Sequence, residues 1–471
     1  MIILQPTLTL ADPHICTDFK DRLNMYTAVF DVLVRRDLTG KFVPQLAKSW
    51  QVSADACTWT FVLRDDIVFH NGDRFSADDV VGSITRACDP AVGGELGTEG
   101  VWASYLGDAT LKAINEQTFE MQLARPMADL CELLMAIPIM PKAVLPDVPN
   151  VFVGSGPYRM VSSDKDEVVL EPFEKSAVRQ PSSVEPLIFR AEPDEAKRLA
   201  AFKAGKADLV SALSQNTAAE LSPQALAHES NLCVAFLINC MKGPGVDKRI
   251  RQALNYAVDV QAMIDTAHNG AATPLSGPLT DLHFGCDPAV RPYPYDRAKA
   301  GELVAMAKAD GFNGKLDIDI PMILPNESPL LGEMIAQNLA EVGIEVTLHH
   351  YDDRPAYAHM VKDKRIHDVC CFDSSPLSTY RVLREKINSD VAGPWWQGYD
   401  NSAVNALLDK ASATVDDEAR QALYREAYAI MHDDAPWIFL YRPTIFWGIG
   451  VDVPEFSVSP EGLLRFEAAN N

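Results

Sequence analysis

The side chains best suited to bind a charged solute gather in one stretch of this sequence, between Asp373 and Asn401. Arg381 and Arg384 stand three positions apart in a helix-like run, so we expect them to share one helix face. A guanidinium group donates paired hydrogen bonds to a carboxylate or a phosphate. This favours a small polar solute with an anionic group, and ordinary surface ion pairing is the alternative for either arginine. Hydroxyl-bearing residues precede the two arginines, at Ser374, Ser375, Ser378, Thr379 and Tyr380.

The segment GPWWQGYDN, residues 393–401, places two adjacent tryptophans in a loop that glycine and proline interrupt on both sides. Neighbouring side chains of an extended segment point in opposite directions. One tryptophan can therefore enter a core, whereas the other needs a ligand or a second surface. We expect Trp395 or Trp396 to contact a ligand, with Tyr399 beside them, and the sequence does not choose between the two tryptophans.

Histidine and acidic residues meet at the end of one predicted strand, where His349 and His350 are followed by Asp352 and Asp353. Adjacent strand residues face opposite sides of a sheet, and no third histidine lies nearby in the sequence. Polar side chains at strand ends are ordinarily solvated. We therefore expect no metal site and no cofactor.

Sequence signatures of enzymes are missing: there is no GxGxxG, P-loop, GxSxG or HExxH motif. The glycine-rich GSGPY at residues 154–158 is followed by a strand-like YRMV and not by a helix, so it indicates a turn. No pair among the Asp, Glu and Ser residues is marked as catalytic. We therefore expect a protein that is not an enzyme.

The composition describes a globular chain of two or three domains, since 471 residues exceed one ordinary core. The net charge of -23 argues against nucleic acid or an anionic membrane surface as a partner. No apolar run reaches the ~18 residues of a membrane span. The first residues lack the basic region and cleavage site of a signal peptide, and instead predict a β-strand beginning almost at Met1.

The nine cysteines are scattered, odd in number and without a CxxC pair. This pattern favours free thiols over a disulfide framework or a zinc site. Free thiols are a liability in an oxidising compartment, so the cysteines favour a reducing one. They stand at Cys16, Cys57, Cys88, Cys131, Cys233, Cys240, Cys286, Cys370 and Cys371.

Helix and strand patterns alternate along the chain, which indicates an α/β architecture with mixed sheets. CTWTFVLR, residues 57–64, alternates as a half-buried strand does, and the next predicted helix has Ser76 as its N-cap. Further helices are predicted at 193–205, 247–260, 295–311, 328–343, 401–411 and 416–433.

Residues 29–86, VFDVLVRRDLTGKFVPQLAKSWQVSADACTWTFVLRDDIVFHNGDRFSADDVVGSITR, closely resemble the signature region of the family 5 extracellular solute-binding proteins. These are the receptors of ABC importers for peptides, nickel chelates, opines and related solutes. The pieces GSGPYRM, FKAGKADLV, DKRIRQALNYAVD and DDAPWIFLYRP follow in the order of that family. The resemblance covers residues 6 to 450.

The resemblance implies a two-lobed fold of the periplasmic-binding-protein type (type II), with two hinge strands and an extra subdomain in lobe one. It also implies a monomer that encloses a small molecule by hinge closure and presents it to an ABC permease at the periplasm. The implied boundaries are residues 1–239 plus 440–471 for lobe one, about 36–153 for its subdomain, and 240–439 for lobe two.

Lobe two departs from the peptide-binding relatives, which carry a tryptophan and an aspartate that binds the peptide ammonium. Here that tryptophan is missing, and Asp373 is the only acid nearby. We therefore favour a solute of the opine, sugar-acid or modified-peptide type over a generic peptide. Tyr26 and Trp102, which the resemblance places at the cleft, can equally be core residues. The expected ligand-binding residues are Tyr26, Trp102, Ser375, Arg381, Arg384, Trp395, Trp396 and Tyr399.

Two other functions stay open at this point. The missing signal peptide and the nine cysteines would suit a cytoplasmic protein that reuses the same cleft as a sensor or an enzyme. A nickel or metallophore receptor would depend on His349, His350 and His367.

Overall fold

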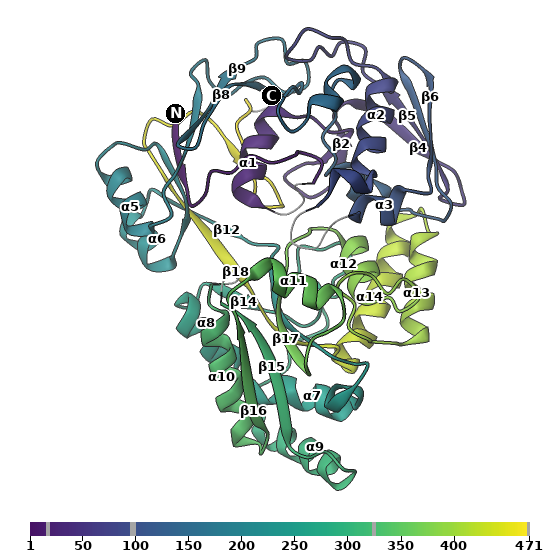
Figure 1. Cartoon of the computed structure of the whole chain (residues 1–471), viewed down its shortest axis with the longest axis vertical. Coiled ribbons are helices and arrows are strands. Elements are labelled where there is room, and N and C mark those ends of the chain that lie inside the picture. The colour runs from purple at the N-terminus through teal and green to yellow at the C-terminus, as the bar shows by residue number, and fades with distance from the viewer. Residues whose placement is uncertain (16–18, 95–99, 323–325, 469–471) are drawn as a thin grey trace. The chain divides into compact units, whose positions relative to one another are not determined.

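The computed structural model describes residues 1–15, 19–94, 100–322 and 326–468, drawn in colour in Figure 1. The chain divides into two compact units: Met1–Glu229 with Ile445–Asn471, and Ser230–Thr444. The expected boundaries were 240 and 440. The observed ones differ because β13 (Cys233–Ile238) and the first residues of β18 (Trp437–Ile449) pair with each other and with strands of the second unit.

The first unit is built on a mixed sheet in which β1 (Ile2–Gln5) runs parallel to both of its neighbours, β10 and β11. The predicted strand at Met1 is thus confirmed. Ile3 of β1 is fully buried in a core that also contains Tyr158, Phe189 and Phe466. The remaining strands and helices around this sheet are β8 (Tyr158–Ser163), β9 (Glu167–Pro172), β10 (Leu187–Ala191), β11 (Leu209–Leu213), β12 (Ala225–Glu229), α1 (Lys20–Val29), α5 (Glu195–Lys203) and α6 (Gln215–Leu221).

A second, antiparallel sheet of the first unit has the order β4-β5-β7-β6 and lies within the range expected for the extra subdomain. Its strand β5 buries Trp59, Phe61 and Leu63, as the alternation predicted. Helix α2 packs on it and begins at Ser76 with a capping box closed by Asp79, so the predicted N-cap is confirmed. The elements here are β4 (Ala47–Val52), β5 (Thr58–Leu63), α2 (Ala77–Ala87), α3 (Val101–Leu106), β6 (Thr110–Asn115), β7 (Thr118–Gln122) and α4 (Leu130–Leu134).

The second unit contains a mixed sheet in which β15 is parallel to β16 and β17, whereas β13 is antiparallel to β17. Figure 1 shows α13 and α14 side by side in yellow-green, apart from the strands β15 and β16. The elements are α7 (Lys248–Ala257), α8 (Val260–His268), β14 (Ala272–Pro274), α9 (Arg297–Ala309), β15 (Lys315–Pro321), α10 (Ser328–Glu341), β16 (Glu345–Tyr351), α11 (Arg354–Lys362), β17 (Val369–Ser374), α12 (Thr379–Lys386), α13 (Ser402–Ser412) and α14 (Asp417–Asp434).

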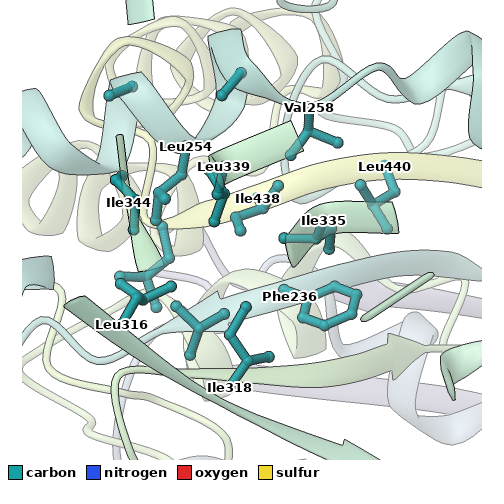
Figure 2. Packing of buried hydrophobic residues seen from close by; sticks show 14 of the residues in the cluster. Phe236, Leu254, Val258, Leu316, Ile318, Ile335, Leu339, Ile344, Ile438 and Leu440 are labelled. Atoms are coloured by element: carbon teal, nitrogen blue, oxygen red, sulfur yellow. The ribbon is translucent and has the colours of Figure 1, made fainter. Parts of the chain in front are cut away.

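Hydrophobic residues cover both faces of this sheet, an arrangement typical of sheets with buried parallel strands. On one face, Leu316 and Ile318 of β15 pack with Leu339 of α10 and Ile438 of β18 (Figure 2). A second cluster, on the other side, joins β13 and β17 to α11, α12, α13 and α14. Trp395, from the stretch that the sequence predicts to bind a solute, packs at the border of this second cluster.

Candidate ligand-binding site

The connection between β17 and α12 is fixed by hydrogen bonds from other parts of the second unit. The Nε2 atom of His283 lies 2.9 Å from the carbonyl oxygen of Pro376. Asn231 donates from its side-chain amide to the carbonyl oxygen of Ser375, one of the expected site residues, which is partly exposed. These contacts place the start of α12 at a defined position.

Helix α12 carries a buried group of charges. The Nε atom of Arg381 lies 3.5 Å from one carboxylate oxygen of Glu385, and the ammonium nitrogen of Lys386 lies 3.4 Å from the other. All three side chains are at most 5 % exposed. Burying a charge costs several kcal/mol unless it is paired. Arg381 is therefore part of a built charge cluster and not a solvated surface arginine.

Arg384 behaves differently from Arg381. Its guanidinium group lies 2.5 Å from Asp409 of α13, an exposed carboxylate, and covers the ring of Tyr380 at 5.9 Å from the centroid. Arg381 and Arg384 both lie on α12, but their guanidinium groups have different partners, Glu385 of the same helix for Arg381 and Asp409 of α13 for Arg384. The roles of both in ligand binding stay a prediction.

A further cation, which the sequence reasoning missed, comes from the first residue of α11. Arg354 lies 3.4 Å from Asp373 at the end of β17, and its side chain is 12 % exposed. The carboxylate that could bind a peptide ammonium is thus engaged with an arginine. A signal was present in the sequence, since Arg354 follows the N-cap Asp353 directly after a predicted strand.

The two tryptophans of residues 393–401, here called the tryptophan loop, have different surroundings. Trp395 packs against Phe372 of β17, with ring centroids 5.5 Å apart, at the border of the second hydrophobic cluster. Trp396 donates from its indole nitrogen to the carbonyl oxygen of Tyr399 at 2.6 Å. Both tryptophans are partly exposed. Trp395 thus packs toward β17, whereas Trp396 is hydrogen-bonded to another residue of the tryptophan loop.

Tyr399 is a core residue of the second unit, with a relative exposure of 4 %. Its hydroxyl donates to the carboxylate of Asp434 at 2.8 Å, and Asn401 donates to the same oxygen at 2.7 Å. Burial, together with that carboxylate, raises the pKa of Tyr399 well above its usual range. These contacts anchor the end of the tryptophan loop on α14.

The two expected site residues of the first unit are both buried. Tyr26 exchanges hydrogen bonds with the backbone of Ala11 through its hydroxyl and meets Phe30 edge to face. Trp102 donates from its indole nitrogen to the carbonyl oxygen of His14 at 2.9 Å. Both aromatic side chains thus have the core character that the sequence left open, and their contact with a ligand stays a prediction.

The histidines do not form a metal site with Asp352 and Asp353. The rings of His349 and His367 stack with centroids 4.2 Å apart, and they bond to Asp317 and Asp319 of β15 at 2.9 and 2.6 Å. Among the described residues, no three His, Cys, Asp or Glu side chains are arranged to hold a metal ion. The histidine cluster therefore gives no support to a nickel site.

Comparison with known proteins identifies the family. The profile of the bacterial extracellular solute-binding proteins, family 5, matches residues 41–417. The chain belongs to this family. Family 5 proteins are transport receptors and not enzymes, and this chain is accordingly the substrate-binding protein of an ABC importer.

Its relatives in the family bind different ligands. The chain is 28% identical to the heme-binding protein A of Haemophilus influenzae, over 90% of this chain and 83% of that protein. It is 27% identical to the glutathione-binding protein GsiB of Pectobacterium atrosepticum, over 100% of this chain and 93% of that protein. The agropinic-acid complex of the binding protein AgaA from A. tumefaciens superposes with a TM-score of 0.81 at 21% identity, over 100% and 99% of the two chains. The predicted two-lobed α/β fold is thereby confirmed.

The described part of the chain contains no helix that combines the length and apolar character needed to cross a membrane. Eight of the nine cysteines are free thiols in the structure, and Cys16 lies outside the described residues.

Proposed function

We propose that this receptor encloses a small polar solute with an anionic group between its lobes by hinge closure. The solute would be of the opine, sugar-acid or modified-peptide type. The observation that carries the proposal is the concentration of cationic side chains around the β17–α12 connection. Arg354, Arg381 and Lys386 are all nearly buried there, and hydroxyl-bearing residues precede Arg381 in the sequence. Such groups suit a carboxylate or phosphate.

Two further observations support an acid over an unmodified peptide. The ion pair between Asp373 and Arg354 occupies the carboxylate that an α-ammonium group would need. Among the relatives, AgaA is described in complex with agropinic acid and GsiB as glutathione-binding. Both of these ligands carry carboxylate groups.

The partners we propose are the solute and an ABC permease, with the receptor acting as a monomer in the periplasm and binding no nucleic acid. The cysteines permit this compartment. Burial raises the pKa of Cys233 to about 12 and that of Cys240 to about 11, which keeps both thiols protonated and poorly reactive. Free thiols of this kind survive oxidising conditions better than their number alone suggests.

Calorimetry with a matched panel tests the solute class. The panel is agropinic acid, glutathione and gluconate, the amide of each acid, an unmodified dipeptide and the nickel–histidine complex. We expect an acid to bind and its amide to fail. A ligand at a hundredfold excess over its Kd stabilises the folded state by ~2.7 kcal/mol, so thermal melting provides an independent readout.

Two variants locate the site. Arg381→Met and Arg384→Met should each weaken acid binding at least tenfold, which corresponds to about 1.4 kcal/mol. Arg159→Met removes a surface ion pair of the first unit and serves as the control. Tight binding of the dipeptide alone, or equal binding of an acid and its amide, would overturn the anionic-solute proposal.

A further inference from the structure

The end of α11 contains a residue whose type does not suit its backbone. Lys364 has a φ of 60°, the left-handed region that favours glycine. Its amide bonds to Val361 and the next amide bonds to Met360, which is the hydrogen-bond pattern of a Schellman motif. Lys364 occupies the position at which that motif usually has glycine.

Three other helices of this chain end in a Schellman motif that has glycine at the left-handed position. Helices α5, α9 and α10 end in the same hydrogen-bond pattern, and glycine occupies the left-handed position in each case: Gly205, Gly311 and Gly343. Strained backbone persists where the surrounding structure gains something from it. We therefore expect the side chain of Lys364 to make contacts that offset the strain of its backbone.

That side chain reaches the tryptophan loop. The ammonium group of Lys364 donates to the carbonyl oxygen of Gly393 at 2.7 Å and to that of Pro394 at 2.6 Å. Both carbonyls immediately precede Trp395. Gln397, just after the two tryptophans, donates to the carbonyl oxygen of Val361 at 2.8 Å, so the end of α11 holds the pair from both sides.

Besides its left-handed backbone, Lys364 has an ammonium group that is partly removed from water, which also costs free energy. Burial lowers the pKa of Lys364 to about 8, and the carboxylate of Asp363 opposes that shift only in part. The tryptophan loop presents carbonyl groups to the ammonium of Lys364. Helix α12 packs on the same loop through the backbone of Glu385, which lies against Gly393. The charged groups on that side are Glu385 and Lys386. Glycine at this position would end α11 without backbone strain and without a desolvated charge. The need to end the helix therefore does not explain the lysine.

We propose that Lys364 is a positioning residue of the solute site, which fixes the tryptophan loop so that Trp395 packs against Phe372. The hold of Lys364 on the loop follows from the contacts above. That the loop borders the solute rests on the proposed function. Lys364 itself acts through the loop and does not need to touch the solute.

Three substitutions separate the role of the side chain from that of the backbone. Lys364→Gly relieves the left-handed backbone and removes the ammonium, Lys364→Met keeps the strain and removes the ammonium, and Lys364→Arg keeps a charge that can donate to both carbonyls. The readout is acrylamide quenching of tryptophan emission. The contribution of the loop is obtained by subtracting the signal of each protein with Trp395→Phe and Trp396→Phe.

We expect Lys364→Gly and Lys364→Met to raise the quenching constant of the loop tryptophans about twofold, because the loop opens locally more often. Lys364→Arg should restore the wild-type value. In the wild type, quenching should rise between pH 7 and 9.5 as the ammonium loses its proton, and it should stay flat in Lys364→Arg. Wild-type quenching in Lys364→Gly, or a pH profile shared by Lys364→Arg, would overturn the proposal.

No solute is needed for this measurement, so it is independent of the proposed function. Titration of each variant with agropinic acid and with glutathione then adds the second step. Weaker binding in Lys364→Gly, restored in Lys364→Arg, supports the positioning role. Altered quenching with no binding of any acid in the wild type would overturn the proposed function and leave the hold of Lys364 on the loop intact.

Discussion

Trp395 packs against Phe372 with ring centroids 5.5 Å apart, and this contact joins the tryptophan loop to the strand that ends in the Asp373–Arg354 ion pair. The ammonium nitrogen of Lys386 lies 5.9 Å from the centroid of the same Phe372 ring. One phenylalanine thus connects the aromatic and the cationic parts of the candidate site. A substitution in the aromatic part should therefore alter the packing of the cationic part, and the reverse should also hold.

The first prediction distinguishes the two tryptophans. Trp395→Ala removes a ring packed on a hydrophobic cluster and should lower the free energy of unfolding by about 2 kcal/mol or more. Trp396→Ala removes a partly exposed ring that is hydrogen-bonded to the carbonyl oxygen of Tyr399, and we expect the smaller loss of about 1 kcal/mol that one such bond contributes. Urea unfolding followed by far-ultraviolet circular dichroism measures both without relying on tryptophan emission. Equal losses would contradict the different surroundings of the two rings.

The second prediction concerns the buried charges of α12. Glu385→Gln removes the carboxylate that Arg381 and Lys386 share, so we expect a loss of about 3 kcal/mol in the free energy of unfolding. The control is Asp409→Asn, which removes the exposed partner of Arg384 and should cost at most about 1 kcal/mol. Urea titrations of the two variants at pH 7 give the comparison, and a larger loss in Asp409→Asn would refute the distinction.

The elements of the fold could be predicted from the sequence to a large extent. The helix predicted at 247–260 is α7, capped by Asp247, and the one at 416–433 is α14, capped by Asp416. In both cases an acidic N-cap residue precedes an amphipathic segment, and this pattern predicts the start of a helix. Helix α11 is not among the predicted helices, although Asp353 caps it and Pro355 stands in its first turn, where proline is well tolerated.

The site was less predictable, because its contacts join residues far apart in the sequence. Arg354 meets Asp373 only because α11 follows β16 and packs beside the end of β17, and Lys364 reaches Gly393 across two elements. The spacing of Arg381 and Arg384 gave a shared face, but spacing does not reveal that Glu385 takes one guanidinium and Asp409 the other. For Arg384, Arg354 and Lys364 the deciding partner lies on another element, whereas the partner of Arg381 is on its own helix but was not identified from the spacing.

A third prediction concerns acid stability and rests on His70 in the first unit. Burial lowers the pKa of His70 to about 4, and its Nδ1 atom accepts a hydrogen bond from the amide of Gly154. The folded pKa lies below the unfolded value of about 6.5. The neutral imidazole therefore contributes stability that is fully present above pH 6.5 and is lost as the pH falls toward 4.

The size of this contribution is on the order of 3 kcal/mol at neutral pH. The measurement is the free energy of unfolding of the wild type minus that of His70→Gln, followed from pH 7 to pH 4, and the difference should shrink by about that amount. His359→Gln, at an exposed position of α11, controls for the removal of a histidine. A difference that stays constant over this range would exclude His70 as the acid-sensitive group.

The last prediction concerns the cost of holding Lys364 in place. Its pKa is lowered from 10.5 to about 8, so between these values the unfolded chain binds the proton and the folded chain does not. Stability rises with pH wherever the unfolded state binds more protons. The melting temperature of the wild type should therefore rise relative to that of Lys364→Gly between pH 8 and pH 10.5.

Below pH 8 the Lys364→Gly variant should melt at the same temperature as the wild type or higher, since it loses both the strained backbone and the desolvated charge. Differential scanning calorimetry in matched buffers gives both comparisons. A wild type that loses melting temperature relative to Lys364→Gly as the pH rises would mean that the ammonium stabilises the fold outright. The left-handed lysine would then be explained by its net contribution to stability, and no role in the solute site would be needed to account for it.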